Sequence, residues 1–132
     1  MDYQEIVTAE LMMHDIRLCT GCESYNSHSR GYAIPDDRTI HVSAKMATRK
    51  TLCKFLHEVG HIVKGHKKGC KLKRWQREDE AESYAKESMR MLGIPYPRER
   101  GRRSSGYVNR MKRWGKRISN GLKEHRQFYA MS

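Results

Sequence analysis

The sequence predicts a small α+β domain that is mainly helical, with a short β-hairpin before a helix that carries a His-Glu-x-x-His motif and a basic amphipathic helix at the C-terminal end. Apolar residues recur at every third or fourth position in several segments, a spacing typical of amphipathic helices. Two β-prone runs, at 31–34 and 39–43, are separated by the turn-forming residues 35–38. A chain of 132 residues has room for one hydrophobic core.

The first predicted helix lies at the N-terminal end of the chain. Asp2 and Glu5 have the spacing of a capping box, and apolar residues follow at helical spacing. We expect this helix to end near Thr20 and Gly21. The hairpin at 31–43 comes next.

Three further helices are predicted after the hairpin. Thr48 or Thr51 can cap the second helix, which should run to His66. The third helix should run from 74 to 92, where Gly93 ends it. A fourth amphipathic helix is expected over residues 107–122.

Positive charge is concentrated in the last quarter of the chain. Lys and Arg number 27 against 15 Asp and Glu, a formal net charge of +12. Residues 98–132 hold eleven of these cations and two Glu, a net charge of +9. Such a tail suits nucleic acid or an acidic protein surface, and the alternative is a solvated helix face. The candidate nucleic-acid contacts are Arg110, Lys112, Arg113, Lys116 and Arg117.

The sharpest motif is the run HEVGH at 57–61. Two imidazoles four residues apart lie on one face of a helix and can point their nitrogens at one metal ion. Glu58 follows the first histidine, where it can hold and deprotonate a water bound to the metal. The motif therefore predicts a catalytic metal site with His57 and His61 as ligands and Glu58 as the general base.

A catalytic zinc takes a third protein ligand and keeps one position open for water. The downstream candidates are His66, Glu78, Glu80 and Glu82. Glu78 fits best, because it shares the inner stripe of the third helix with small alanines that would let the two helices approach closely. Glu80 falls on the other side of this helix, and Glu82 is placed to orient a ligand histidine through its second ring nitrogen.

These residues resemble the ImmA/IrrE family of metallo-endopeptidases. The run HEVGHIVKGH at 57–66 is similar to the family's H-E-x-G-H helix, and EDEAESYA at 78–85 is similar to its later helix E-x-x-A-[N/D]-x-F-A. Glu82 stands where the family has Asn or Asp, and Tyr84 where it has Phe. The hairpin also matches the family's strand pair, so the resemblance covers residues 1–95.

The resemblance implies a zinc endopeptidase of the gluzincin arrangement, with Glu78 as the third zinc ligand. It also implies a bacterial, phage or mobile-element setting and a helix-turn-helix repressor as the protein substrate. Residues 1–97 would form the peptidase domain and 98–132 a basic helical extension of it. We expect the strand at 39–43 to accept an extended substrate as a further strand. The alternative function is a DNA- or RNA-binding module in which the zinc site is structural or degenerate.

The chain has no apolar run of about 18 residues and no basic start followed by an apolar run, so we expect a cytoplasmic protein without a membrane segment. In a reducing compartment Cys19, Cys22, Cys53 and Cys70 would be thiols or metal ligands rather than disulfides. Cys19 and Cys22 have the spacing of a second, structural zinc site, and isolated thiols are the alternative.

Four side chains are candidates to donate to the oxyanion that forms during hydrolysis, and the sequence does not choose among them. They are His66, Tyr84, Tyr96 and Tyr107. Cys53 lies one helical turn before His57, and we expect it to be a small core residue rather than part of the metal pocket.

Overall fold

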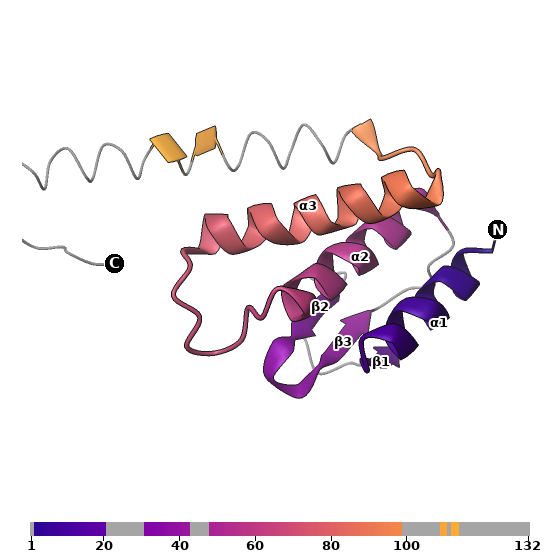
Figure 1. Cartoon of the computed structure of the whole chain (residues 1–132), viewed down its shortest axis with the longest axis horizontal. Coiled ribbons are helices and arrows are strands. Elements are labelled where there is room, and N and C mark those ends of the chain that lie inside the picture. Colours follow the sequence, from indigo (N-terminus) through magenta and orange to yellow (C-terminus); the bar gives the residue numbers. More distant parts are fainter. Residues whose placement is uncertain (1, 21–30, 43–47, 99–108, 111, 114–132) are drawn as a thin grey trace, which may run out of the picture.

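The computed structural model describes residues 2–20, 31–42, 48–98, 109–110 and 112–113. In chain order the elements of this part are α1 (Tyr3–Met13), β1 (Arg17–Thr20), β2 (Gly31–Ile34), the 3-10 helix η1 (Pro35–Asp37), β3 (Thr39–Val42), α2 (Arg49–Val63) and α3 (Arg74–Leu92) (Figure 1). Helix α2 lies between α3 and the three-stranded sheet, and α1 also packs on α2. The fold is therefore a small α+β domain, as the sequence predicts.

The first helix is shorter than predicted. It ends at Met13 rather than near Thr20, and the residues before the predicted end form β1 instead. Asp15 adopts a left-handed backbone conformation, with φ of 53°, and the Arg38 guanidinium donates a hydrogen bond to its carbonyl. Strand β1 pairs in parallel with β3, more than twenty residues further along the chain. Helical spacing in the local sequence does not reveal a pairing of this kind.

The predicted hairpin is confirmed, but its second strand lies in the middle of the sheet. The strand order is β1-β3-β2, with β1 parallel and β2 antiparallel to β3. Both edges of β3 are therefore paired, and the expectation that this strand accepts a substrate strand is wrong. Ile40 and Val42 of β3 are buried against the core, while Thr39 and His41 on the other face are half-buried.

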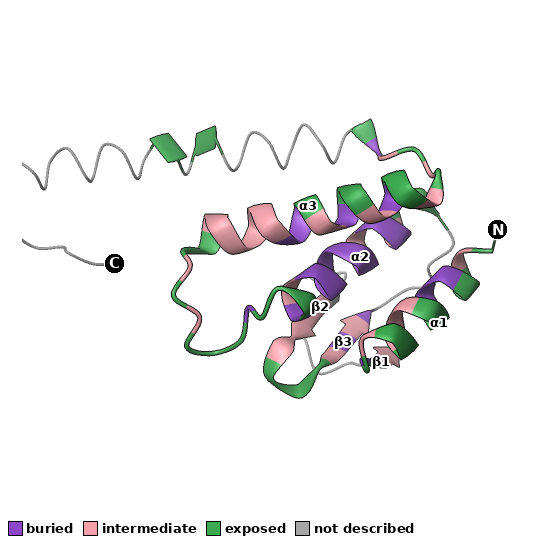
Figure 2. Cartoon of the chain, in the orientation of Figure 1, coloured by how far each residue is buried: buried purple, intermediate pink, exposed green. Residues whose placement is uncertain are grey.

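Thr48, the first of the two predicted N-cap residues, caps helix α2. The Thr51 N–H donates to the Thr48 hydroxyl at 3.2 Å, and the Thr48 N–H donates to the Thr51 hydroxyl at 3.0 Å, which forms a capping box. The helix ends at Val63, so His66 lies beyond it in the connection to α3. Figure 2 shows α2 as the most buried element, since it is covered by α3 on one side and the sheet on the other.

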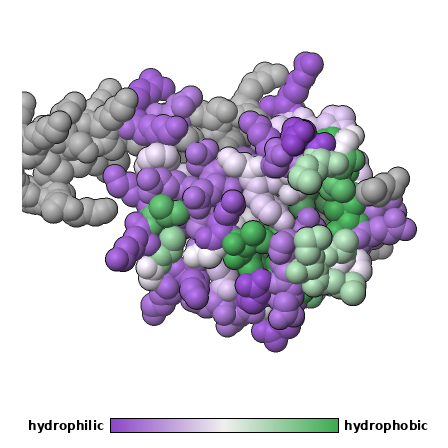
Figure 3. Space-filling view, in the orientation of Figure 1, coloured by the Kyte–Doolittle hydropathy of each residue, from purple (hydrophilic) through white to green (hydrophobic). Residues whose placement is uncertain are grey.

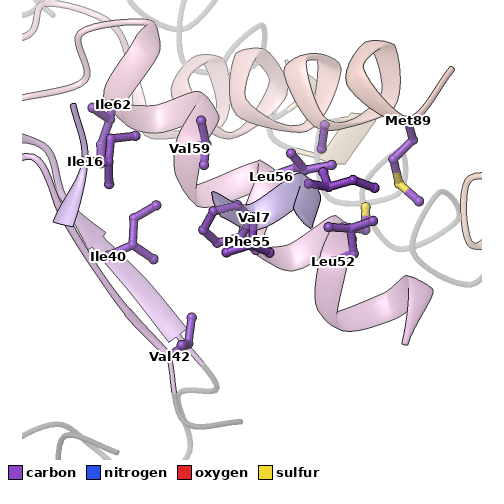
Figure 4. Packing of buried hydrophobic residues seen from close by; sticks show 13 residues of the cluster. Val7, Ile16, Ile40, Val42, Leu52, Phe55, Leu56, Val59, Ile62 and Met89 are labelled. Atoms are coloured by element: carbon purple, nitrogen blue, oxygen red, sulfur yellow. The ribbon is translucent and has the colours of Figure 1, made fainter. Parts of the chain in front are cut away.

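One hydrophobic core holds these layers together (Figure 4). Its fully buried side chains come from α1, β3, α2 and α3, and the largest of them are Phe55, Ile40, Leu52, Leu56, Met89, Val7, Val59 and Cys53. Cys53 is thus a core residue, as expected. Full burial of a side chain of this size stabilises the folded chain by about 1.5–3 kcal/mol relative to exposure.

Helix α3 has its predicted bounds, and Gly93 ends it in the left-handed conformation with φ of 72°. Its face toward α2 buries Ala81, Glu82, Ala85 and Met89. A Cβ atom built on Gly60 of α2 would lie 2.8 Å from the Ala81 carbonyl oxygen and 2.9 Å from the Ala81 Cα. The small residues on both helices therefore permit the close approach that the sequence predicts.

Cys19 of β1 is disulfide-bonded, so the expectation that it is a thiol or a zinc ligand is wrong: a sulfur in a disulfide cannot ligate a metal. Cys53 and Cys70 are not disulfide-bonded. Cys22 lies outside the described residues, as does most of the predicted fourth helix. In the described part of the chain, none of the helices combines the length and the apolar character that a membrane span requires.

Replacing Gly60 by Ala should destabilise the fold. Alanine has the higher helix propensity by about 1 kcal/mol, but its methyl group would press on backbone atoms of Ala81 that cannot rotate away. We expect a net loss of about 1–2 kcal/mol in the free energy of unfolding, measured by urea titration. Ser83→Ala, at an exposed position of α3, is the control and should change little. A Gly60→Ala protein as stable as the wild type would mean that α3 can move away without cost.

Candidate metal centre

Three side chains from α2 and α3 converge on one point. Among the described residues His57, His61 and Glu78 form a group whose ligand atoms all lie within 4.8 Å of one another, and this group could hold a metal ion. The Glu78 Oε2 atom lies 2.9 Å from Nε2 of His57 and 2.9 Å from Nε2 of His61. The two Nε2 atoms are 3.2 Å apart. Two imidazole nitrogens and one carboxylate oxygen form a ligand set that suits a divalent transition metal.

The secondary structure explains this convergence. His57 and His61 are four residues apart on α2, so their rings project from one face and meet edge to face with centroids 4.8 Å apart. Glu78 lies in the second turn of α3, on the side that packs against α2. The sequence therefore predicts all three members of the group.

Glu82 holds the His57 ring from the other side. Nδ1 of His57 lies 2.7 Å from Oε1 of Glu82, and both side chains are buried. Oε2 of Glu82 accepts hydrogen bonds from the Tyr96 hydroxyl and, at 3.9 Å, from the Cys53 thiol. With its Nδ1 proton donated to Glu82, His57 can present the Nε2 lone pair to a cation.

A second chain of contacts holds the His61 ring. Nδ1 of His61 lies 2.9 Å from Nδ1 of His66, and Nε2 of His66 lies 2.6 Å from Oε1 of Glu80. The His66 side chain is only 1% exposed, so these contacts must satisfy both of its nitrogens. They are satisfied if His61 donates its Nδ1 proton to His66 and His66 donates its Nε2 proton to Glu80. In this arrangement Nε2 of His61 is also left free to bind a cation.

The pKa values of Glu78 and His57 are shifted because these side chains lie close together and are partly or fully buried. Burial raises the pKa of Glu78, but hydrogen bonds and charge from His57 and His61 outweigh it and hold the pKa well below the usual range. Burial lowers the pKa of His57, but hydrogen bonds to Glu78 and Glu82 and the charge of Glu58 raise it above its ordinary value. In the absence of a cation, the group thus favours protonated histidine beside an ionised carboxylate. A metal ion would replace that positive charge.

Glu58 lies next to the group and is not one of its ligands. Its side chain is 6% exposed, and its Oε2 atom lies 2.6 Å from Nζ of Lys54, one turn earlier on α2. Burial of a carboxylate without such a partner would cost free energy. Lys54 is not among the residues predicted from the sequence, although its spacing of four residues from Glu58 on one helix is the signal that could identify it.

Glu80 takes part in the candidate metal centre, which its helical register does not predict. The register predicts that Glu80 falls on the other side of α3, but its carboxylate accepts a hydrogen bond from His66. The reason is tertiary, because His66 lies in the connection between the helices and reaches Glu80 from the flank of α3. Glu80 is 44% exposed, so exposure alone would not have marked it as part of the centre.

The candidate oxyanion donors have other partners in the described residues. His66 contacts His61 and Glu80, and the Tyr96 hydroxyl donates to Glu82. The Tyr84 hydroxyl donates to Glu10 of α1 at 2.9 Å, and burial and the Glu10 charge raise its pKa. Tyr107 lies outside the described residues.

The candidate nucleic-acid contacts are described in part. Arg110, Lys112 and Arg113 are helical and exposed, and Nζ of Lys112 lies 5.5 Å from the centroid of the Trp75 ring at the start of α3. Lys116 and Arg117 lie outside the described residues.

Comparison of the chain with protein-family models, with curated proteins and with solved structures finds no match. The resemblance to the ImmA/IrrE family therefore rests on the two helical motifs. The geometry of the metal group is independent of that resemblance.

The contacts of His66 and Glu80 predict a loss of metal affinity when they are removed. If the group holds a metal ion, His66→Ala and Glu80→Gln should each weaken metal binding about 10–100-fold, because they release the ring of His61. The effect is measured with zinc as the probe ion, in competition with a chelator. Glu87→Gln, an exposed carboxylate on the same helix, is the control. Unchanged affinity in Glu80→Gln, with native circular dichroism, would contradict this role.

Proposed function

We propose that this chain is a zinc-dependent endopeptidase. The single observation that carries the proposal is the convergence of His57, His61 and Glu78 beside the buried carboxylate of Glu58. Three protein ligands leave one coordination position of a tetrahedral zinc open, which is the arrangement of catalytic sites. A structural zinc site is closed by four protein ligands and has no use for a neighbouring base.

Zinc, when held by these residues, supplies a Lewis acid that polarises the peptide carbonyl and lowers the pKa of a water to about 7. Glu58 would take the proton from the attacking water as the new carbon–oxygen bond forms. The same carboxylate would then give this proton to the leaving amine as the carbon–nitrogen bond breaks. Lys54 would hold the Glu58 carboxylate in position, since the two side chains form an ion pair.

The sheet offers an edge for an extended substrate. β1 and β2 are the outer strands of the described sheet, and β2 is the one that contacts α2, the helix with the metal-binding histidines (Figure 1). We therefore favour β2 as the platform for the substrate backbone, in place of β3. The resemblance to the ImmA/IrrE family suggests a helix-turn-helix repressor as the substrate.

A DNA- or RNA-binding module is the second candidate function. The exposed cations Arg110, Lys112 and Arg113 favour it. A nucleic-acid-binding function does not explain why Glu58, paired with Lys54, lies beside a metal group with an open position. We therefore rank this function below the peptidase. Truncation after Pro97 separates the two, because it should abolish salt-dependent nucleic-acid binding if the tail carries that function.

The variants His57→Ala and Glu58→Gln should differ in metal binding. His57→Ala removes a ligand and should lose stoichiometric zinc, whereas Glu58→Gln should retain it. Both should lose peptidase activity, Glu58→Gln by at least about a hundredfold because the general base is gone. Elemental analysis of untagged protein and incubation with small helix-turn-helix regulators encoded nearby are the measurements.

Glu87→Gln serves as the matched control for Glu58→Gln, since it removes an exposed carboxylate charge without touching the centre. Zinc content that does not fall in His57→Ala would reject the site. A demonstrated cleavage that persists in Glu58→Gln or in the presence of a chelator would reject the mechanism.

A further inference from the structure

The connection between α2 and α3 is strongly basic. We define residues 64–77 as the basic segment, which includes the first turn of α3. It contains seven cations and no Asp or Glu. The cations are Lys64, Lys67, Lys68, Lys71, Lys73, Arg74 and Arg77, and all except the half-buried Arg77 are exposed. Figure 3 shows mostly hydrophilic side chains over the end of the molecule where Figure 1 places this connection.

The basic segment is anchored to the fold. The backbone N–H of Lys68 donates to the Asp36 carboxylate of η1 at 3.3 Å, and the Arg77 guanidinium donates to the Leu72 carbonyl at 2.7 Å. The N–H of Cys70 donates to the Lys67 carbonyl and closes a turn. These hydrogen bonds therefore hold the backbone that carries the cations in one conformation.

The charge of the basic segment is not neutralised by the rest of the described chain. Among the described residues, no ion pair involves its six exposed cations. Of the acidic side chains that follow on α3, Glu78 contacts the histidines of the metal group, Glu80 contacts His66 and Glu82 contacts His57. Asp79, which lies between them, forms no ion pair with these cations among the described residues. Exposed cations without intramolecular partners are free to pair with an acidic ligand.

The basic segment borders the metal centre at both ends. It starts three residues after His61, contains His66, and ends at the residue before Glu78. Lys54 adds a further cation, one third exposed, at the side of Glu58. A polypeptide whose backbone reaches the metal group therefore lies near both ends of the basic segment.

We propose that the basic segment docks an acidic stretch of the polypeptide substrate beside the metal centre. The inference rests on the proposed peptidase function, and it names the class of substrate that this site takes. A polypeptide is favoured over nucleic acid because the basic segment adjoins, at both of its ends, a group whose chemistry suits a peptide bond. Each exposed ion pair is weak, so several acidic residues must contribute and the affinity must fall with salt.

The binding test uses full-length, zinc-loaded Glu58→Gln protein, so that no probe is cleaved. The probes are a fluorescein-labelled peptide of alternating Glu and Ala, its counterpart with Gln for Glu, and an oligothymidine of equal charge. Binding is measured by fluorescence anisotropy at low and at physiological salt. We expect the Glu peptide to bind more tightly than both other probes.

The matched variants carry the same change in charge at different places. Lys67→Glu with Lys71→Glu alters the basic segment, and Arg49→Glu with Arg98→Glu alters two exposed cations at the other end of the α2–α3 pair. The first variant should weaken binding of the Glu peptide about tenfold at low salt, and the second less than about twofold. Equal effects of the two variants, or tighter binding of oligothymidine than of the Glu peptide, would overturn the proposal.

A cleavage profile distinguishes failure of this inference from failure of the peptidase. A mixture of peptides from a digested bacterial proteome is incubated with wild-type and Glu58→Gln protein, and the sites cut only by the wild type are aligned. Enrichment of Asp and Glu near these sites, lost in the Lys67→Glu, Lys71→Glu protein, supports docking. Glu58-dependent cleavage without acidic enrichment overturns the inference and leaves the peptidase standing. Selective binding of the Glu peptide without any cleavage rejects the peptidase and leaves an acidic-peptide docking surface.

Discussion

The close contact between α2 and α3 at Gly60 and Ala81 is the constraint on which the candidate site depends. Without a side chain on Gly60, the Ala81 backbone can lie against α2, and this distance allows carboxylates from α3 to reach the histidines of α2. A separation larger by the width of a methyl group would lengthen hydrogen bonds that are now 2.7–2.9 Å. Core packing and site geometry are therefore set by the same contact.

Helix α3 uses three acidic residues for three tasks. Glu78 closes the metal group, Glu82 fixes the ring of His57, and Glu80 fixes the ring of His61 through His66. Each histidine of the candidate metal group thus has its second nitrogen held by a chain of contacts that ends on a carboxylate of α3. Such contacts orient a ligand ring and raise its basicity, which keeps a metal site ready to bind.

The charges inside and outside the centre are arranged differently. Inside, every described carboxylate has a histidine, lysine or tyrosine partner, as burial requires. Outside, the basic segment at 64–77 and the exposed cations Arg110, Lys112 and Arg113 face solvent. Among the described residues the cations therefore lie mostly at the surface, and those of the basic segment adjoin the metal group along the chain.

The sequence by itself determined the features that depend on neighbouring positions along the chain. These are the hairpin, the end of α3 at Gly93 and the convergence of His57, His61 and Glu78, which follows from helical spacing and one buried stripe. It left two caps for α2, Thr48 and Thr51, of which the structure uses Thr48. Only the tertiary structure decided that residues 17–20 form a strand, because their partner is β3. It also decided that Glu80 serves the metal centre, because His66 reaches it from outside the helix. Both depend on contacts between distant segments, and local spacing carries no information about such contacts.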